Sequence, residues 1–193
     1  MRDLSYIRSW FAGSNPSGFY HGAVVTGGDP RTVNDPAPRN PLGILYRHWD
    51  GNVYRYVKFD WGTDHVAAMA GGCVHWKQLS YANGVFTVTS DASDGFDIYY
   101  GHLNDAAGFL GGVVTNSCYC WAQVGGIGMV LTDETDGGQL NAGVLFGSNG
   151  YDSVVSTGSS GLAVAQLIVN GSDWTGDSPV LNPVQARILI VPA

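Results

Sequence analysis

The sequence predicts an all-β protein, with a sandwich or barrel-like body and an extended N-terminal arm. Glycine supplies 28 of the 193 residues, and charged residues make up only 13%, about half the usual ~25%. Glu134 is the one glutamate among 16 acidic residues, whereas the abundant aspartate, asparagine, glycine and valine suit turns and strands rather than helices. A helical bundle is therefore excluded. The hydrophobic content of 45% also excludes a disordered chain.

Turn signals divide the chain after residue 43 into short segments. Asn-Gly and Asp-Gly pairs favour the type I′ turns of β-hairpins, and the chain has six: Asp50-Gly51, Asn83-Gly84, Asp94-Gly95, Asp136-Gly137, Asn149-Gly150 and Asn170-Gly171. Strands are predicted over residues 44–49, 52–59, 74–81, 85–89, 96–100, 113–115, 119–124, 127–132, 143–146, 162–169 and 185–191. Strands this short, at a spacing of about 8–12 residues, favour a sandwich or a barrel.

Two of these strands carry more specific expectations. In the strand at 52–59, the alternation predicts two faces. Tyr54, Tyr56 and Lys58 lie on one face, and Val53, Arg55, Val57 and Phe59 lie on the other. The glycines at 125, 126 and 128 are expected to form a turn between the strands at 119–124 and 127–132.

The first 43 residues differ from the rest and are expected to form a separate arm and connector, with the β-rich body at 44–193. Residues 27–41 include four prolines, which favour an extended connector because proline fixes φ and lacks an amide donor. Fifteen residues in a polyproline-like conformation span ~45 Å, enough to leave the parent body. The aromatic cluster ahead of the connector is then expected to contact another molecule, and the alternative is that the arm folds back on its own domain. The candidate contact residues are Tyr6, Trp10, Phe11, Phe19, Tyr20, Arg31 and Arg39.

Charge is distributed unevenly. Residues 1–59 hold seven basic and four acidic residues, a net charge of +3, whereas residues 60–193 hold two basic and twelve acidic residues, a net charge of −10. The acidic body repels nucleic acid, so no nucleic-acid partner is expected. The cationic front suits an acidic partner or the acidic body of its own or a neighbouring subunit. No apolar run reaches the ~18 residues that span a membrane, and residues 1–6 lack the apolar core of a secretory signal, so synthesis in the cytoplasm is expected.

Residues capable of chemistry do not form a recognisable site in the sequence. The five histidines show no metal-binding spacing, and Gly158–Gly161 lacks the spacing of a nucleophile elbow. Cys118 and Cys120 share a strand face and would supply half of a soft-metal site, but zinc sites need four ligands. Cys73, Cys118 and Cys120 are better interpreted as small buried hydrophobic residues with free thiols. We expect no catalytic residue, no metal and no cofactor.

Three stretches together resemble virion structural proteins of tailed bacteriophages, of the type that decorates or cements the capsid. They are Asn52–Phe59 (Asn-Val-Tyr-Arg-Tyr-Val-Lys-Phe), the Ala/Gly-rich Ala67–Trp76, and Tyr119–Gly126 (Tyr-Cys-Trp-Ala-Gln-Val-Gly-Gly). An apolar strand at Val184–Val191 follows them, so that the resemblance covers about residues 45–193. It implies a β-rich body without catalysis, assembly as a trimer or another small ring, and attachment to the major capsid protein on the capsid surface.

Other functional classes remain open. A carbohydrate-binding head fibre or spike is the main alternative, because exposed tryptophans on a β surface stack on sugars as readily as they fill an interface. Trp61 and Trp174 lie in polar, loop-like surroundings. An enzyme, such as a polysaccharide depolymerase or a small hydrolase, is the third possibility.

Overall fold

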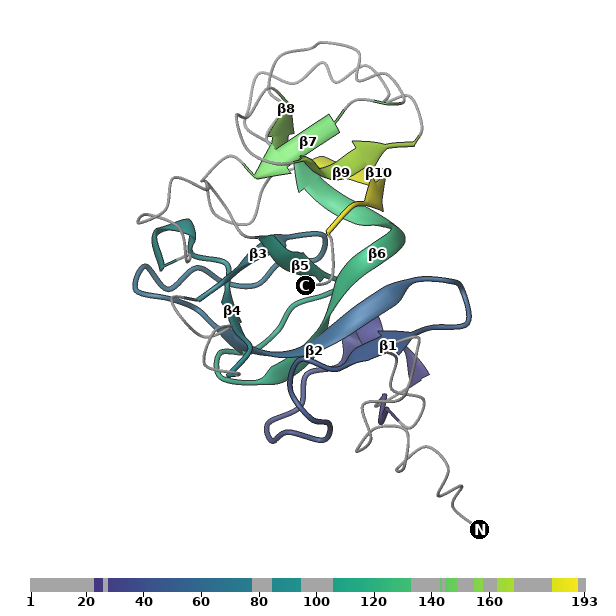
Figure 1. Ribbon diagram of the computed structural model, residues 1–193. Coiled ribbons are helices and arrows are strands. Elements are labelled where there is room, and N and C mark those ends of the chain that lie inside the picture. Colours follow the sequence, from purple (N-terminus) through teal and green to yellow (C-terminus); the bar gives the residue numbers. More distant parts are fainter. Residues whose placement is uncertain are drawn as a thin grey trace.

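The computed structural model describes residues 23–25, 28–77, 85–94, 106–132, 143, 145–148, 155–157, 163–168 and 182–190. The strands in this part of the chain are β1 (Leu45–Arg47), β2 (Val53–Asp60), β3 (Cys73–Trp76), β4 (Thr87–Thr89), β5 (Ala106–Leu110), β6 (Tyr119–Thr132), β7 (Leu145–Ser148), β8 (Val155–Thr157), β9 (Ala163–Leu167) and β10 (Asn182–Ile188). Two short 3₁₀ turns, η2 (Pro30–Thr32) and η3 (Ala92–Asp94), accompany them. The all-β prediction is confirmed (Figure 1). Among the described residues, no helix has the length and hydropathy that a membrane crossing requires.

Five strands close into a small barrel. The order is β2, β4, β3, β5 and β6, and β6 pairs back with β2 to complete the ring. The β2–β4 pairing is parallel and the other four are antiparallel. The interior is filled by one hydrophobic cluster that includes Val57, Phe59, Val74, Trp76 and Val88. The barrel-like body expected from the sequence is therefore present.

The long strand β6 belongs to two sheets, as Figure 1 shows. Its first half pairs with β2 and β5 in the barrel, whereas Gly126–Thr132 pairs with β10. Strands β10, β9, β7 and β8 then follow in order, and β8 returns to β6 through Thr132 and Val155. The prediction of a turn at residues 125–128 is wrong, because the chain continues through this stretch as one strand.

A second core joins this C-terminal sheet to the outside of the barrel. Cys73 and Phe109 from the barrel strands pack with Val130, Leu167 and Ile188. Small residues in the same cluster, such as Ala165 and Ala186, allow the two layers to approach closely. The C-terminal sheet is therefore packed on the barrel through its inner face, and its outer face is left to solvent.

A third core lies on the other side of the barrel and confirms the alternation predicted for β2. Tyr54 and Tyr56 pack with Trp121 and Val33 on the outer face, and Val57 and Phe59 point into the barrel. Both faces of β2 are buried because the chain around Val33 covers the tyrosine face.

The segment between residues 28 and 42 lies against the body. Asp35 pairs with Tyr119 of β6 as an isolated bridge, and Val33, Asp35 and Asn40 are buried. The sequence predicts that the connector at residues 27–41 extends away from the β-rich body. Residues 28–41 do not, because their buried side chains pack against the barrel, with Val33 in the third core. The five aromatic residues of the predicted contact set, from Tyr6 to Tyr20, lie outside the described residues.

The strand predicted at residues 113–115 is absent. Thr115 instead bonds the side chain of Asn34: its amide donates to Asn34 Oδ1 and its Oγ1 accepts from Asn34 Nδ2.

The structure also contains two strands, β5 and β8, that were not predicted from the sequence. In β5, a Cβ on Gly108 would lie 2.8 Å from Cβ of Ala122, so the strand is close to β6 and needs small residues there. The strand predicted at 96–100 lies outside the described residues.

Candidate functional site

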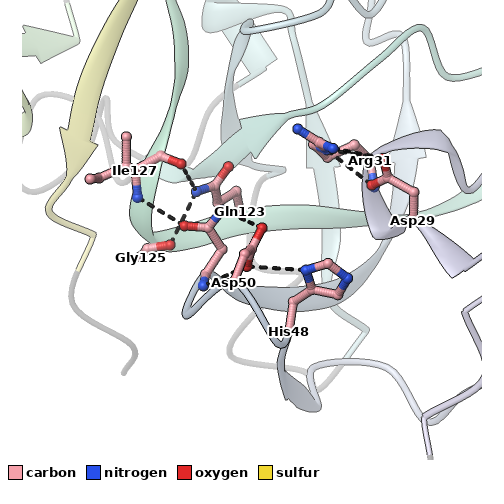
Figure 2. A network of polar contacts seen from close by, with 8 residues as sticks. Asp29, Arg31, His48, Asp50, Gln123, Gly125 and Ile127 are labelled. Carbon is pink, nitrogen blue, oxygen red and sulfur yellow. Dashed lines mark hydrogen bonds and ion pairs between the residues drawn. The ribbon is translucent and has the colours of Figure 1, made fainter.

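The candidate site lies at the bend where β6 passes from the barrel into the C-terminal sheet. Gly126 has a φ of +92°, a conformation that favours glycine. Asn52 fixes the bend, since its Oδ1 accepts a 2.9 Å hydrogen bond from the amide of Ile127. Gln123 fixes it from within the strand, because its Nε2 donates to the carbonyls of Gly125 and Ile127, both at 3.2 Å (Figure 2).

The turn between β1 and β2 supports Asn52. Asp50 Oδ1 accepts from the Asn52 amide at 2.9 Å, and Asp50 Oδ2 accepts from Asn52 Nδ2 at 3.0 Å. His48 Nδ1 lies 3.1 Å from Asp50 Oδ1 (Figure 2). Partial burial alone would raise the pKa of Asp50, but the hydrogen bonds from Asn52 and His48 outweigh it and hold that pKa below its ordinary value. The turn is thus a small, internally bonded polar unit.

An ion pair between Arg31 and Asp29 lies near this bend. Arg31 Nε and Nη2 donate to the carboxylate of Asp29 at 2.8–3.2 Å. The backbone of η2 lies so close to the end of β5 that a Cβ on Gly111 would fall 2.7 Å from Cα of Arg31. Glycine at that position is therefore what allows Arg31 to reach the bend of β6.

These groups enclose a cavity of about 290 Å³. Its lining includes Arg31, Asn52, Leu110, Gln123, Ile127 and Met129. Figure 2 shows how side chains from separate segments converge here. The cavity therefore combines an ion pair, two side-chain amides and an aliphatic wall.

The outer face of the C-terminal sheet continues from the cavity. The register places Ile127 opposite Arg187, Arg187 opposite Gln166, and Gln166 opposite Leu145, so these four side chains form a row across four strands. Ile127 and Leu145 are about half exposed, and Arg187 is exposed. The row therefore has two polar side chains in its middle and an aliphatic side chain at each end.

The two described residues of the predicted contact set are both in ion pairs. Arg31 pairs with Asp29 at the cavity, and Arg39 Nε lies 3.2 Å from Asp35 Oδ1. Each arginine side chain is still 54% exposed. They lie in different surroundings, so the structure does not bring them into one site.

The other candidates from the sequence are placed as follows. Cys73 and Cys120 are buried in hydrophobic clusters, and Cys118 packs against the barrel interior, as expected of small hydrophobic residues. Within the described ranges, no three His, Cys, Asp or Glu side chains gather as metal ligands would. Trp61 is partly buried, whereas Trp49 is 88% exposed. The position of Trp49 directly before the Asp50-Gly51 turn is the sequence feature that could have predicted this exposure.

Comparisons with known proteins give little. No family model and no curated protein matches the sequence. Among solved structures, the chain is similar to the N base of head fiber gp8.5 of bacteriophage phi29, with 9% identity and a TM-score of 0.41 over 71% of this chain and 93% of that one. At that identity and TM-score, no property of the head fiber carries over to this chain. Capsid decoration, capsid binding and the trimer stay predictions.

Proposed function

We propose that the chain is a non-enzymatic virion structural protein of a bacteriophage, which decorates the capsid and stabilises it by binding the major capsid protein lattice. The observation that carries this proposal is the way the N-terminal segment is fastened. Val24 and Asn40 exchange two hydrogen bonds, of 2.7 and 2.9 Å, between backbone and side chain. The chain at Val24, which follows the aromatic residues in sequence, is therefore held to the segment that packs on the barrel.

The chemistry of the first 22 residues fits a protein partner. Aromatic side chains are favoured interface anchors because each buries much area for few rotatable bonds. Residues 1–22 carry two arginines and one aspartate, a net charge of +1, whereas residues 60–193 carry a net charge of −10. This difference in sign favours contact between copies and supports the proposed homotrimer. The resemblance of Asn52–Phe59 and Tyr119–Gly126 to capsid decoration proteins also supports the proposal.

A truncation tests this proposal. Residues 28–42 contribute to the third core, so the deletion is limited to residues 1–22. We expect the truncated protein to keep its β circular dichroism spectrum but to lose its trimeric mass in light scattering and its co-sedimentation with capsids that lack it. A truncated protein that keeps both properties would show that the arm is not the contact. A full-length protein that binds no capsid would refute the proposal itself.

A second candidate function is carbohydrate binding, as a head fibre or spike module. It is favoured by Trp49, which is 88% exposed in the β1–β2 turn, with His48 packed against it at 5.2 Å between ring centroids. A tryptophan this exposed in polar surroundings is a stacking platform for a sugar ring. Quenching of tryptophan fluorescence by sugars, lost in Trp49→Phe but kept in Trp61→Phe, is the expected result.

A further inference from the structure

The cavity at the bend of β6 is lined by the side chain of a buried residue, Gln123, which carries a hydrogen-bond acceptor. Gln123 is 5% exposed, and both protons of its Nε2 are taken by the carbonyls of Gly125 and Ile127. No hydrogen bond to its Oε1 is seen among the described residues. This oxygen lies beside Gly128 in the cavity lining, where a Cβ on Gly128 would be 2.5 Å away. An acceptor in the wall of a cavity favours a ligand that brings a hydrogen-bond donor.

Donors face the same space. Arg31 uses Nε and Nη2 on Asp29, which leaves the two N–H groups of Nη1 for a ligand. Asn52 donates to Asp50 and also to the hydroxyl of Tyr54, so the donors open to a ligand are those of Arg31. The cavity thus offers an acceptor and several donors, so its ligand carries groups that both donate and accept.

The local charge argues against an anion. Asp29 already neutralises the guanidinium of Arg31, and the nearby carboxylate of Asp50 adds a second negative charge. A phosphate or a carboxylate ligand would meet an already satisfied cation and a surplus of negative charge. The chemistry therefore favours a neutral ligand.

The remaining wall is aliphatic. Ile127 and Met129 follow each other on one face of β6, with 47% and 53% of their surface exposed beside the cavity. A volume of about 290 Å³ lies just below the ~300–1,000 Å³ typical of ligand sites. This size suits a ring-sized molecule rather than a folded partner.

We infer that this cavity is a subsite for one neutral sugar residue of a glycan. Gln123 Oε1 accepts from a sugar hydroxyl, Arg31 donates to others, and Ile127 and Met129 contact the C–H face of the ring. The inference rests on the second candidate function and names its site. Trp49 lies three residues before Asn52 in the same turn and offers a surface for the next residue of the glycan.

Titration of the full chain with glucose, galactose, mannose and N-acetylglucosamine, followed by ¹H–¹⁵N NMR, tests the inference, with glucuronic acid as the anionic comparison. We expect at least one neutral sugar to bind with a Kd of about 1–10 mM and to shift the signals of Gly111, Gly128 and the Gln123 side-chain amide. Glucuronic acid should bind more weakly. Met129→Trp, which fills the mouth of the cavity from an exposed position, should raise the Kd at least about tenfold. Val113→Trp is the matched control, because Val113 is 76% exposed and does not line the cavity.

The outcomes separate the site from the function. If a neutral sugar binds Met129→Trp as tightly as the natural protein, glycan binding stands and this cavity is not its site. If no neutral sugar binds at about 100 mM, both the subsite and the glycan-binding candidate are wrong. Tighter binding of glucuronic acid would overturn the preference for a neutral ligand.

Discussion

The hydroxyl of Tyr56 donates a 3.0 Å hydrogen bond to the carboxylate of Asp35, and both side chains are buried. Tyr56 belongs to β2, whereas Asp35 belongs to the N-terminal segment. The same hydroxyl accepts a 3.2 Å hydrogen bond from the backbone amide of Arg39, which also belongs to the N-terminal segment. Burial raises the pKa of Tyr56, and the hydrogen bond to Asp35 adds to that rise. One phenol therefore fastens the N-terminal segment to the barrel, close to the start of the proposed contact arm.

Tyr56→Phe should destabilise the protein, because it leaves a buried carboxylate with one partner fewer. Hydrogen bonds to charged groups contribute about 1.5–3 kcal/mol, and a loss of that size in the free energy of unfolding is expected. Urea unfolding measures it. Tyr46→Phe is the control, since Tyr46 lies in the same core and its hydroxyl has no hydrogen-bond partner among the described residues; it should change stability by less than about 0.5 kcal/mol. Equal effects of the two variants would show that the Tyr56–Asp35 bond does not secure the segment.

Gly111→Ala should displace η2 from the barrel. The added methyl group would overlap the Arg31 backbone, with 2.7 Å to its Cα, and overpacking of this kind costs about 1–3 kcal/mol. The matched variant is Gly125→Ala, whose Cβ would meet Val53 at an ordinary 3.6 Å and should be tolerated. Thermal unfolding of both variants is the measurement, and a Gly111→Ala protein as stable as Gly125→Ala would contradict the close approach.

The parts of the fold that the sequence predicted depend on local patterns. The alternation along Val53–Phe59 correctly separated Tyr54 and Tyr56 from Val57 and Phe59, because a strand has a period of two whatever it packs against. The Asp50-Gly51 pair correctly marked the turn between β1 and β2, where Arg47 pairs with Val53.

What the sequence did not predict depends on contacts between distant residues. The glycines at 125, 126 and 128 have low strand propensity, yet β6 continues because Asn52 and Gln123 bond its backbone through the bend. The cavity exists only because β6 bends at this point. Nothing in the sequence around Gln123 therefore predicts that this residue lines a site. Arg31 was predicted as a contact residue, but its place beside Gly111 depends on how η2 docks on the barrel.

The three thiols should differ in reactivity. Cys73 and Cys120 are buried, and burial raises the pKa of Cys73 to about 12 and also raises that of Cys120. Cys118 is partly exposed. Since the thiolate is the reactive form, a thiol reagent should modify Cys118 alone in the folded protein and all three residues in denaturant. Rapid modification of Cys73 in the folded state, or fewer than three reactive thiols after unfolding, would contradict this assignment.

His75 is a buried titratable side chain in the barrel wall. It lies on β3, opposite Thr89 of β4 and Ala106 of β5, and it is 1% exposed. Neither ring nitrogen has a hydrogen-bond partner among the described residues. Burial lowers the pKa of His75 to about 4, and the charge of Asp91 opposes only part of that shift. The folded protein therefore holds His75 neutral well below the pH at which an exposed histidine is protonated.

Stability should fall as the pH drops from about 6.5 to about 4, because over this range the unfolded chain binds a proton at His75 that the folded protein does not. A difference of about two and a half pKa units corresponds to roughly 3 kcal/mol of unfolding free energy, present in full above about pH 6.5 and lost by about pH 4. The carboxylates with lowered pKa values, which are those of Asp29, Asp50, Asp60 and Asp91, lose their contribution at lower pH, near and below ~3.8. His75→Gln keeps a neutral polar side chain of similar size and cannot titrate, so its stability should stay level between pH 6.5 and 4, whatever its value at pH 7. Urea unfolding of both proteins at half-unit steps of pH gives the two slopes. A natural protein with no slope in this window, or a His75→Gln variant with the same slope, would show that another group is responsible.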